Sequence, residues 1–204
     1  MNSNLRFFSN ETIDRPIFEN DEFVCVATLG SIIPGWCLIS PKRKVLNLAE
    51  LSEHERNSLS VFSTEIQSAI EKEYGFWTMF EHGPKSAGSK FGCGIDQAHL
   101  HIAPVQVERL TEVVKSTELE WSETPSGWPN SETIKQRDYL WLSDGKDSMI
   151  SFPDQPISQF FRKCVAQIAN VPNQWNYKTD AFLHNVAITQ AKITTASSEG
   201  ALVQ

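Results

Sequence analysis

The chain has 204 residues and 40% of them are apolar, so it can bury a sizeable core, which argues against global disorder. Its formal net charge of −7, with one short basic run at 42–44, argues against nucleic acid as a partner, because sequence-independent affinity needs many phosphate contacts. Residues 1–15 lack the apolar region of a signal peptide, no apolar stretch is long enough to span a bilayer, and no cysteines form a Cys-x-x-Cys pair, so we expect a cytoplasmic protein without a membrane partner.

The first half of the chain predicts a sheet with one long helix. Apolar runs at 23–27 and 35–40 indicate two buried strands, and two further strands are expected at 76–80 and 97–105. Between the two pairs, Ser52-Glu53-His54-Glu55 has the pattern of a capping box and predicts a helix that Gly75 ends. The apolar face of this helix is formed by Leu59, Phe62, Ile66 and Ile70. This order of elements indicates an α+β fold.

The second half has a different composition, beginning after about residue 108. Residues 116–137 are polar and predict a long excursion or linker. Two apolar runs, Tyr139–Leu142 and Ser148–Phe152, predict a hairpin, and Ser158 is expected to cap an amphipathic helix. We therefore divide the chain into an N-terminal arm (1–15), a first domain (16–108), a C-terminal α/β extension (109–190) and a tail (191–204) that we expect to be disordered.

The residues at 97–102 carry the clearest chemical pattern. Alternate side chains of a strand share a face, so Ala98, Leu100 and Ile102 are expected to point into the core. Gln97, His99 and His101 would then line up on the other face, toward a pocket or solvent. An ordinary exposed strand face would show the same spacing, and the pattern alone does not separate the two interpretations.

The loop at 86–94 precedes this strand and contains small residues and glycines, with Lys90 inside it and Lys85 directly before it. Glycines allow backbone N–H groups to approach an anion closely, although most such loops are only turns. Followed directly by a His-x-His strand, the loop favours a phosphate site. The candidate phosphate-binding residues are Ser89, Lys90, Gly92, Cys93 and Gly94.

These motifs together resemble the histidine-triad (HIT) superfamily, whose signature is His-x-His-x-His followed by two apolar residues. Residues 97–103 match that signature with Gln97 in the place of the first histidine. The segments 17–21, 34–42 and 80–84 also resemble family segments in the expected order, so that the resemblance covers residues 15–108. It implies an antiparallel sheet with a long packed helix and, because HIT proteins commonly pair, a homodimer.

The resemblance also implies a chemistry. In the family, the middle histidine attacks the α-phosphate of a nucleotide derivative, and water or another acceptor resolves the nucleotidyl-histidine. The matching nucleophile is His99, and His101 matches the histidine that contacts phosphate oxygens. A neutral imidazole suits attack and a cationic one suits phosphate binding, which agrees with both roles. This scheme requires neither a metal nor a cofactor, and its partner is a small nucleotide substrate.

Several positions depart from the family pattern. Gln97 can orient a neighbour but cannot titrate. Trp36 stands where many members carry a histidine, and Thr28 falls about where many carry an acidic residue that binds ribose. We include both among the possible pocket residues, together with Glu81, His82 and Arg162. Arg162 has a plain alternative as part of the solvated flank of an amphipathic helix.

Two other functions remain open from the sequence. A binding module that keeps nucleotide affinity but little turnover is favoured by the changes at positions 28, 36 and 97, whereas the intact His99 and His101 favour an enzyme. A metal site on the same two histidines is a third interpretation, but the sequence offers no clear third ligand.

Overall fold

The computed structural model describes residues 13, 15–92, 94–124 and 127–200 of the chain. The strands are β1 (Pro16–Glu19), β2 (Phe23–Ala27), β3 (Cys37–Pro41), β4 (Thr78–Gly83), β5 (Leu100–Ala103), β6 (Ser122–Thr124), β7 (Tyr139–Ser143) and β8 (Ser148–Ser151). The helices are the short 3-10 helix η1 (Leu48–Glu50), α1 (Glu53–Tyr74), α2 (Val107–Lys115), α3 (Ser131–Ile134), α4 (Phe160–Ile168) and α5 (Leu183–Gly200).

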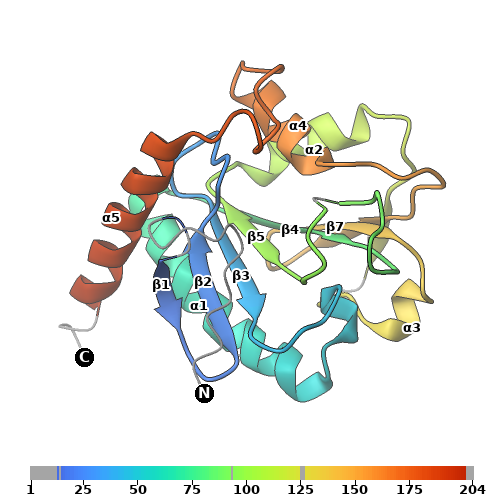
Figure 1. The fold of residues 1–204 in the computed structure, drawn as a ribbon, viewed down its shortest axis with the longest axis horizontal. Coiled ribbons are helices and arrows are strands. Elements are labelled where there is room, and N and C mark those ends of the chain that lie inside the picture. Colours follow the sequence, from blue (N-terminus) through green and yellow to red (C-terminus); the bar gives the residue numbers. More distant parts are fainter. Residues whose placement is uncertain (1–12, 14, 93, 125–126, 201–204) are drawn as a thin grey trace.

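The strands of the described residues form one antiparallel sheet in the order β1-β2-β3-β5-β4-β7-β8-β6 (Figure 1). This confirms the predicted α+β class with an antiparallel sheet. Since β7 pairs with β4, the second half of the chain continues the sheet of the first half. No break in the sheet marks residue 108, and the division of the chain into domains stays a prediction.

Helix α1 covers one face of the sheet and begins as the sequence predicts. The hydroxyl of Ser52 accepts from the amide of Glu55, whose carboxylate accepts from the Ser52 amide, so the capping box is complete. Gly75 ends the helix with a φ of 83°. The four predicted apolar residues are buried in one core cluster with Ala98, Leu100 and Ile102 of the histidine segment.

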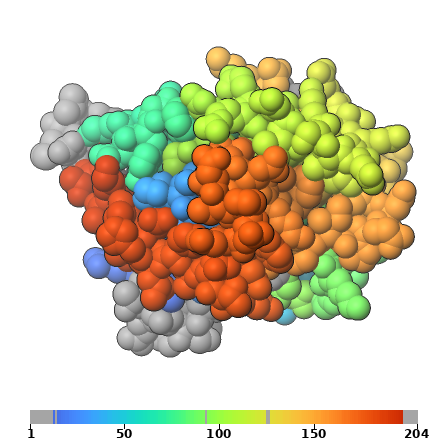
Figure 2. Space-filling view, turned by 90° about the horizontal axis from the view of Figure 1, so that it is seen from above, coloured from blue at the N-terminus to red at the C-terminus, as the bar shows by residue number. Residues whose placement is uncertain are grey.

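Helices α2 and α4 cover the opposite face, toward the top of Figure 1. In the view from above, the orange segment that carries α4 and the following loop occupies the middle of the molecule, between α5 in red and α2 in yellow-green (Figure 2). The core on this side contains Trp36, Phe80, Phe160 and Phe161. The C-terminal half therefore forms a second layer over the sheet.

Three expectations about the second half are wrong. Residues 191–200 belong to α5 rather than to a disordered tail, because Ile193 and Ala196 pack into the core beside α1. The 116–137 segment contains β6 and α3. Gln159 rather than Ser158 occupies the N-cap position of α4, without a capping hydrogen bond from its side chain, and the hydroxyl of Ser158 donates instead to the carbonyl of Gly92 at 3.0 Å. The N-terminal arm lies almost wholly outside the described residues.

None of the helices in the described part of the chain is both long and apolar enough to cross a membrane.

Candidate active site

His99 and His101 lie on the same face of the sheet, as predicted. Strand β5 lies between β3 and β4, and its register places His101 opposite Phe80. The rings of His101 and Phe80 stack with centroids 4.9 Å apart, and the centroids of His99 and His101 lie 5.0 Å apart. Both histidines are buried on the α4 side of the sheet. The alternative of an ordinary solvent-exposed strand face, which the sequence did not exclude, is therefore wrong.

The ring of His99 is oriented by its own backbone. Its Nδ1–H donates to the carbonyl of Gln97 at 2.8 Å, which leaves the lone pair on Nε2. Burial lowers the pKa of His99 first, and the positive charge of Arg162 lowers it further, against the opposing effect of the Gln97 carbonyl. His99 is therefore a neutral imidazole with a nucleophilic nitrogen near neutral pH.

His101 is held as the opposite tautomer. The indole Nε1–H of Trp36 donates to His101 Nδ1 at 3.0 Å, so the proton of His101 lies on Nε2. That Nε2–H is buried and has no hydrogen-bond partner among the described residues. Burial, followed by the charges of His99 and Arg162, lowers the pKa of His101 well below its usual value. His101 is thus a neutral imidazole whose Nε2–H can donate to an acceptor.

A third histidine joins this cluster from the neighbouring strand. The backbone amide of Phe160, the first residue of α4, donates to His82 Nε2 at 2.9 Å. The His82 ring also makes an edge contact with Phe161, with centroids 5.1 Å apart. Burial is the main cause that lowers the pKa of His82 to about 3. The sequence placed His82 only near a pocket, since nothing local to its segment shows that it joins the cluster of His99 and His101.

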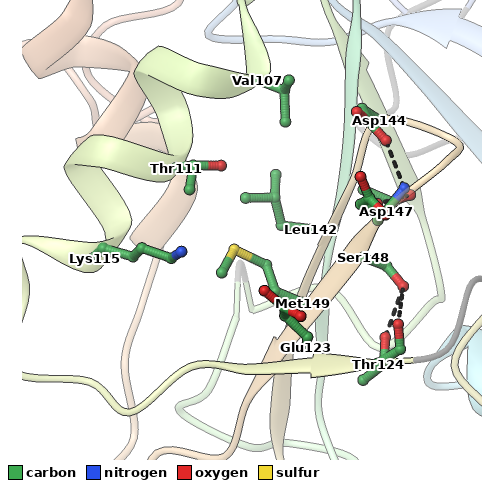
Figure 3. Close-up of a pocket in the computed structure, with 11 residues that line it drawn as sticks. Val107, Thr111, Lys115, Glu123, Thr124, Leu142, Asp144, Asp147, Ser148 and Met149 are labelled. Atoms are coloured by element: carbon green, nitrogen blue, oxygen red, sulfur yellow. Dashed lines mark hydrogen bonds between the residues drawn. The ribbon is translucent and has the colours of Figure 1, made fainter.

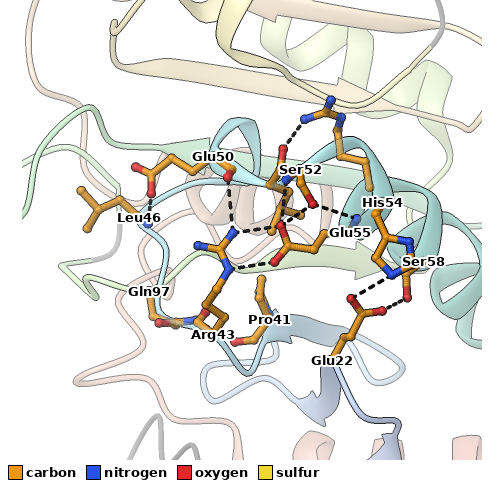
Figure 4. A network of polar contacts seen from close by, with 12 residues as sticks. Glu22, Pro41, Arg43, Leu46, Glu50, Ser52, His54, Glu55, Ser58 and Gln97 are labelled. Carbon is orange, nitrogen blue, oxygen red and sulfur yellow. Dashed lines mark hydrogen bonds and ion pairs between the residues drawn. The ribbon is translucent and has the colours of Figure 1, made fainter.

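Gln97 does not occupy a third place on the histidine face. Strand β5 begins at Leu100, three residues later than expected, and the amide of Gln97 donates to the carbonyls of Pro41 and Arg43 (Figure 4). Arg43 in turn binds the carboxylate of Glu55 in the capping box. The Gln97 side chain therefore ties the histidine segment to the chain before α1, and its backbone carbonyl is the part that meets His99.

The predicted phosphate loop is fastened to the segment that leads into α4. The amide of Gly92 donates to the carbonyl of Ile157 at 3.0 Å, and the amide of Gln159 donates to the carbonyl of Gly92 at 3.1 Å. The hydroxyl of Ser89 accepts from the amide of Phe91. Lys90 and Gly94 are exposed, and Cys93 lies outside the described residues. The Gly92 amide is thus not available to an anion in this conformation.

Residues 9–107 match the family model of the HIT domain. The chain contains a HIT domain. Two solved structures of 21% sequence identity align with 44% of this chain, and the chain covers less than two thirds of either: 59% and 64% of their lengths. They are a hypothetical histidine triad nucleotide-binding protein from Sulfolobus tokodaii, with a TM-score of 0.38, and a HIT-like protein involved in cell-cycle regulation from Bartonella henselae with unknown ligand, with a TM-score of 0.37. None of the curated proteins matches the chain.

Helix α4 of the C-terminal half contacts the HIT domain at the loop between β2 and β3. Arg162 is buried, and its guanidinium donates to the carbonyls of Gly30 and Leu29 and to the hydroxyl of Thr28, at 2.6–2.8 Å. Gly30 has a φ of 71°, and a Cβ there would lie 2.5 Å from Cβ of Tyr177, so only glycine fits. Arg162 therefore binds Thr28 within the fold, rather than forming a solvated basic flank.

Glu81 does not line the histidine pocket of the HIT domain, which corrects its assignment from the sequence. Neighbouring residues of β4 face opposite sides of the sheet, so Glu81 points away from His82. Its carboxylate accepts from the amide of Leu48 at 2.7 Å and from the hydroxyl of Tyr139. Burial raises the pKa of Glu81 to about 8, although both hydrogen bonds act in the opposite direction.

Replacing Glu81 with glutamine is expected to remove a pH dependence of stability. Because the pKa rises from 4.5 to about 8 in the fold, Glu81 stabilises the folded state fully below pH 4.5, and this contribution is lost as the pH rises through about 8. The free energy of unfolding of the wild type should fall over this window relative to that of Glu81→Gln. Urea titrations across the window measure the difference, with the exposed Glu108→Gln as the control. Parallel curves for wild type and Glu81→Gln would contradict the expectation.

The described residues also bear on the metal-site interpretation, and they contain a pocket outside the histidine cluster. Among the described residues, no group of three or more His, Cys, Asp or Glu residues could hold a metal ion, so the metal-site interpretation gains no support there. A pocket of about 290 Å³ lies between α2 and the β7–β8 hairpin, where Lys115, Glu123 and Met149 line it (Figure 3). It contains none of the three clustered histidines.

Proposed function

We propose that this chain is a nucleotidyl hydrolase or transferase that acts on a nucleoside phosphate derivative. His99 attacks the α-phosphorus of a phosphoanhydride, phosphoester or phosphoramidate, and a covalent nucleotidyl-histidine forms. Water or another acceptor then resolves it. The observation that carries the proposal is the hydrogen bond from His99 Nδ1 to the Gln97 carbonyl, because it leaves the Nε2 lone pair for attack.

The same hydrogen bond supports the attack itself. As Nε2 bonds to phosphorus and the leaving group departs with the electron pair of its P–O or P–N bond, the imidazole ring becomes positively charged. The Nδ1–H then donates to the Gln97 carbonyl more strongly, which stabilises the charge where it develops. His101 Nε2–H is the complementary donor for a nonbridging phosphate oxygen.

The test is turnover of a panel of adenylated and guanylated compounds, followed by release of the mononucleotide. Brief mixing and a denaturing quench at neutral or alkaline pH, where a phosphoryl-histidine bond survives, should trap a protein whose intact mass has gained one nucleotidyl group. Adduct without release to water indicates a transferase that needs its acceptor. Neither adduct nor release across the panel would reject the proposal.

Replacing Trp36 with phenylalanine is expected to slow turnover about tenfold, the effect of one lost hydrogen bond of about 1.4 kcal/mol. The variant removes the Nε1–H that fixes the tautomer of His101 and keeps an aromatic ring against Phe80. Nitrogen-15 NMR of the imidazoles should show His101 protonated at Nε2 in the wild type and as a mixture of tautomers in Trp36→Phe. Slower turnover with an unchanged tautomer would assign Trp36 to packing alone.

A HIT-domain binding module with little turnover is the alternative, and the burial of the histidines favours it. His99 is 6% exposed and His101 is 1% exposed beneath the layer that contains α4. A substrate reaches them only if that layer moves, which would slow a catalytic cycle. Mononucleotide binding without a trapped adduct would identify the binding module.

A further inference from the structure

His82 belongs to the same buried cluster as His99 and His101, on the strand next to β5. The pairing of β4 and β5 ends at Phe80 and His101, and His82 and His99 follow two residues beyond this pair on their respective segments, close enough for His99 to act electrostatically on His82. Both side chains lie on the face of the sheet that α4 covers. On this face the His82 ring contacts Phe161 of α4, and the Phe80 ring stacks on His101. The site therefore contains a histidine that the His-x-His motif does not include.

The tautomer of His82 is fixed by the C-terminal half of the chain. Its Nε2 accepts from the Phe160 amide, so the ring carries its proton on Nδ1. The side chain is 4% exposed, and Nδ1 is buried without a hydrogen-bond partner among the described residues. A buried N–H that stays unsatisfied is costly and calls for an explanation, which an acceptor supplied by a ligand gives.

The surroundings of His82 favour an anion as that acceptor. Gly92 of the 86–94 loop lies so close that a Cβ there would be 3.4 Å from Cβ of His82. The charged groups that act on His82 from α4 are the cations of Arg162 and Lys163, and Arg162 acts on His99 and His101 as well. Two buried neutral donors, His82 Nδ1–H and His101 Nε2–H, thus belong to the same cluster as His99 and lie in a positive field.

We propose that His82 is a phosphate-contacting residue of this site, whose Nδ1–H donates to a nonbridging oxygen of the phosphoryl group that His99 attacks. The proposal rests on the proposed function. It gives the C-terminal half a chemical task, since α4 fixes the tautomer of a residue that belongs to the HIT domain. Because Nδ1 is buried, the anion reaches it only after a local rearrangement of the residues that cover it.

Two substitutions of His82 separate this role from a structural one. The amide of glutamine reaches the position of Nε2, so His82→Gln keeps an acceptor for the Phe160 amide and loses the Nδ1 donor. The amide of asparagine reaches the position of Nδ1, so His82→Asn keeps the donor and loses the acceptor. We expect His82→Gln to melt near the wild type but to bind inorganic phosphate and AMP about tenfold more weakly, the effect of one hydrogen bond. His82→Asn should melt lower and bind more tightly than His82→Gln.

The measurements are thermal unfolding, calorimetric titration with inorganic phosphate, AMP and GMP, and nitrogen-15 NMR of the ligand-free wild type. Affinities that follow stability across the two variants, or a His82 protonated at Nε2, would overturn the assignment of His82 and leave the proposed function standing. Binding of inorganic phosphate alone, weakened in His82→Gln, would support His82 and reject the nucleotide function. A wild type that binds none of the three anions would overturn both.

Discussion

Replacing His99 with asparagine is expected to lower turnover by a factor on the order of 10⁴ or more, the usual cost of removing a covalent nucleophile. Asparagine places its amide near the position of Nδ1, so it still donates to the Gln97 carbonyl and keeps the chain before β5 in place. It has no atom at the position of Nε2, and neither attack nor adduct formation is possible. The measurement is mononucleotide release in the steady state, together with the intact mass of quenched protein.

The control for this prediction is the folded state of the variant. His99 is buried, so His99→Ala would leave a cavity and its loss of activity would be ambiguous, whereas His99→Asn should change the free energy of unfolding by only about 1–2 kcal/mol. Mononucleotide affinity should also remain measurable in His99→Asn. Turnover at the wild-type rate on a confirmed substrate would show that another residue is the nucleophile.

The parts of the site that the sequence predicted are those coded locally. The alternation along residues 98–102 places His99 and His101 on one face, and Ser52 with Glu55 marks the start of α1 within four residues. Both patterns depend on neighbours along the chain. The sequence alone therefore predicts both patterns, and the structure contains both.

Contacts between distant segments could not be predicted in the same way. The place of His82 in the histidine cluster depends on the pairing of β4 with β5, and the amide that fixes the tautomer of His82 comes from α4. Gln97 was expected to face the pocket. Its side-chain amide instead donates to two backbone carbonyls at and just after the end of β3, so that its N–H groups are satisfied within the fold. The small residues of 191–200 are typical of a disordered tail. In the structure Ile193 and Ala196 pack against α1, and this burial offsets the entropy lost when the helix is ordered.

Replacing Arg162 with methionine is expected to lower the free energy of unfolding by about 3 kcal/mol or more, because hydrogen bonds to a charged group contribute about 1.5–3 kcal/mol each and their acceptors stay buried. The variant keeps an unbranched apolar stem in place of the arginine stem and removes the donors to Gly30, Leu29 and Thr28. For a chain of this size the melting temperature should fall by about 6–12 °C. The free energy of unfolding of Arg162→Lys should lie between that of the wild type and that of Arg162→Met, since one ammonium cannot span three oxygens.

Thr28→Val supplies the matched control for Arg162. It removes one acceptor of the guanidinium and keeps the shape of the side chain, so alone it should cost about 1–2 kcal/mol, because a donor of Arg162 is left unsatisfied. In the Arg162→Met background that donor is already gone, and Thr28→Val should cost much less. The coupling energy of this double-mutant cycle measures the contact directly. Additive losses would mean that α4 is held to the HIT domain by packing of Phe160 and Phe161, and that Arg162 only fills space beside Trp36.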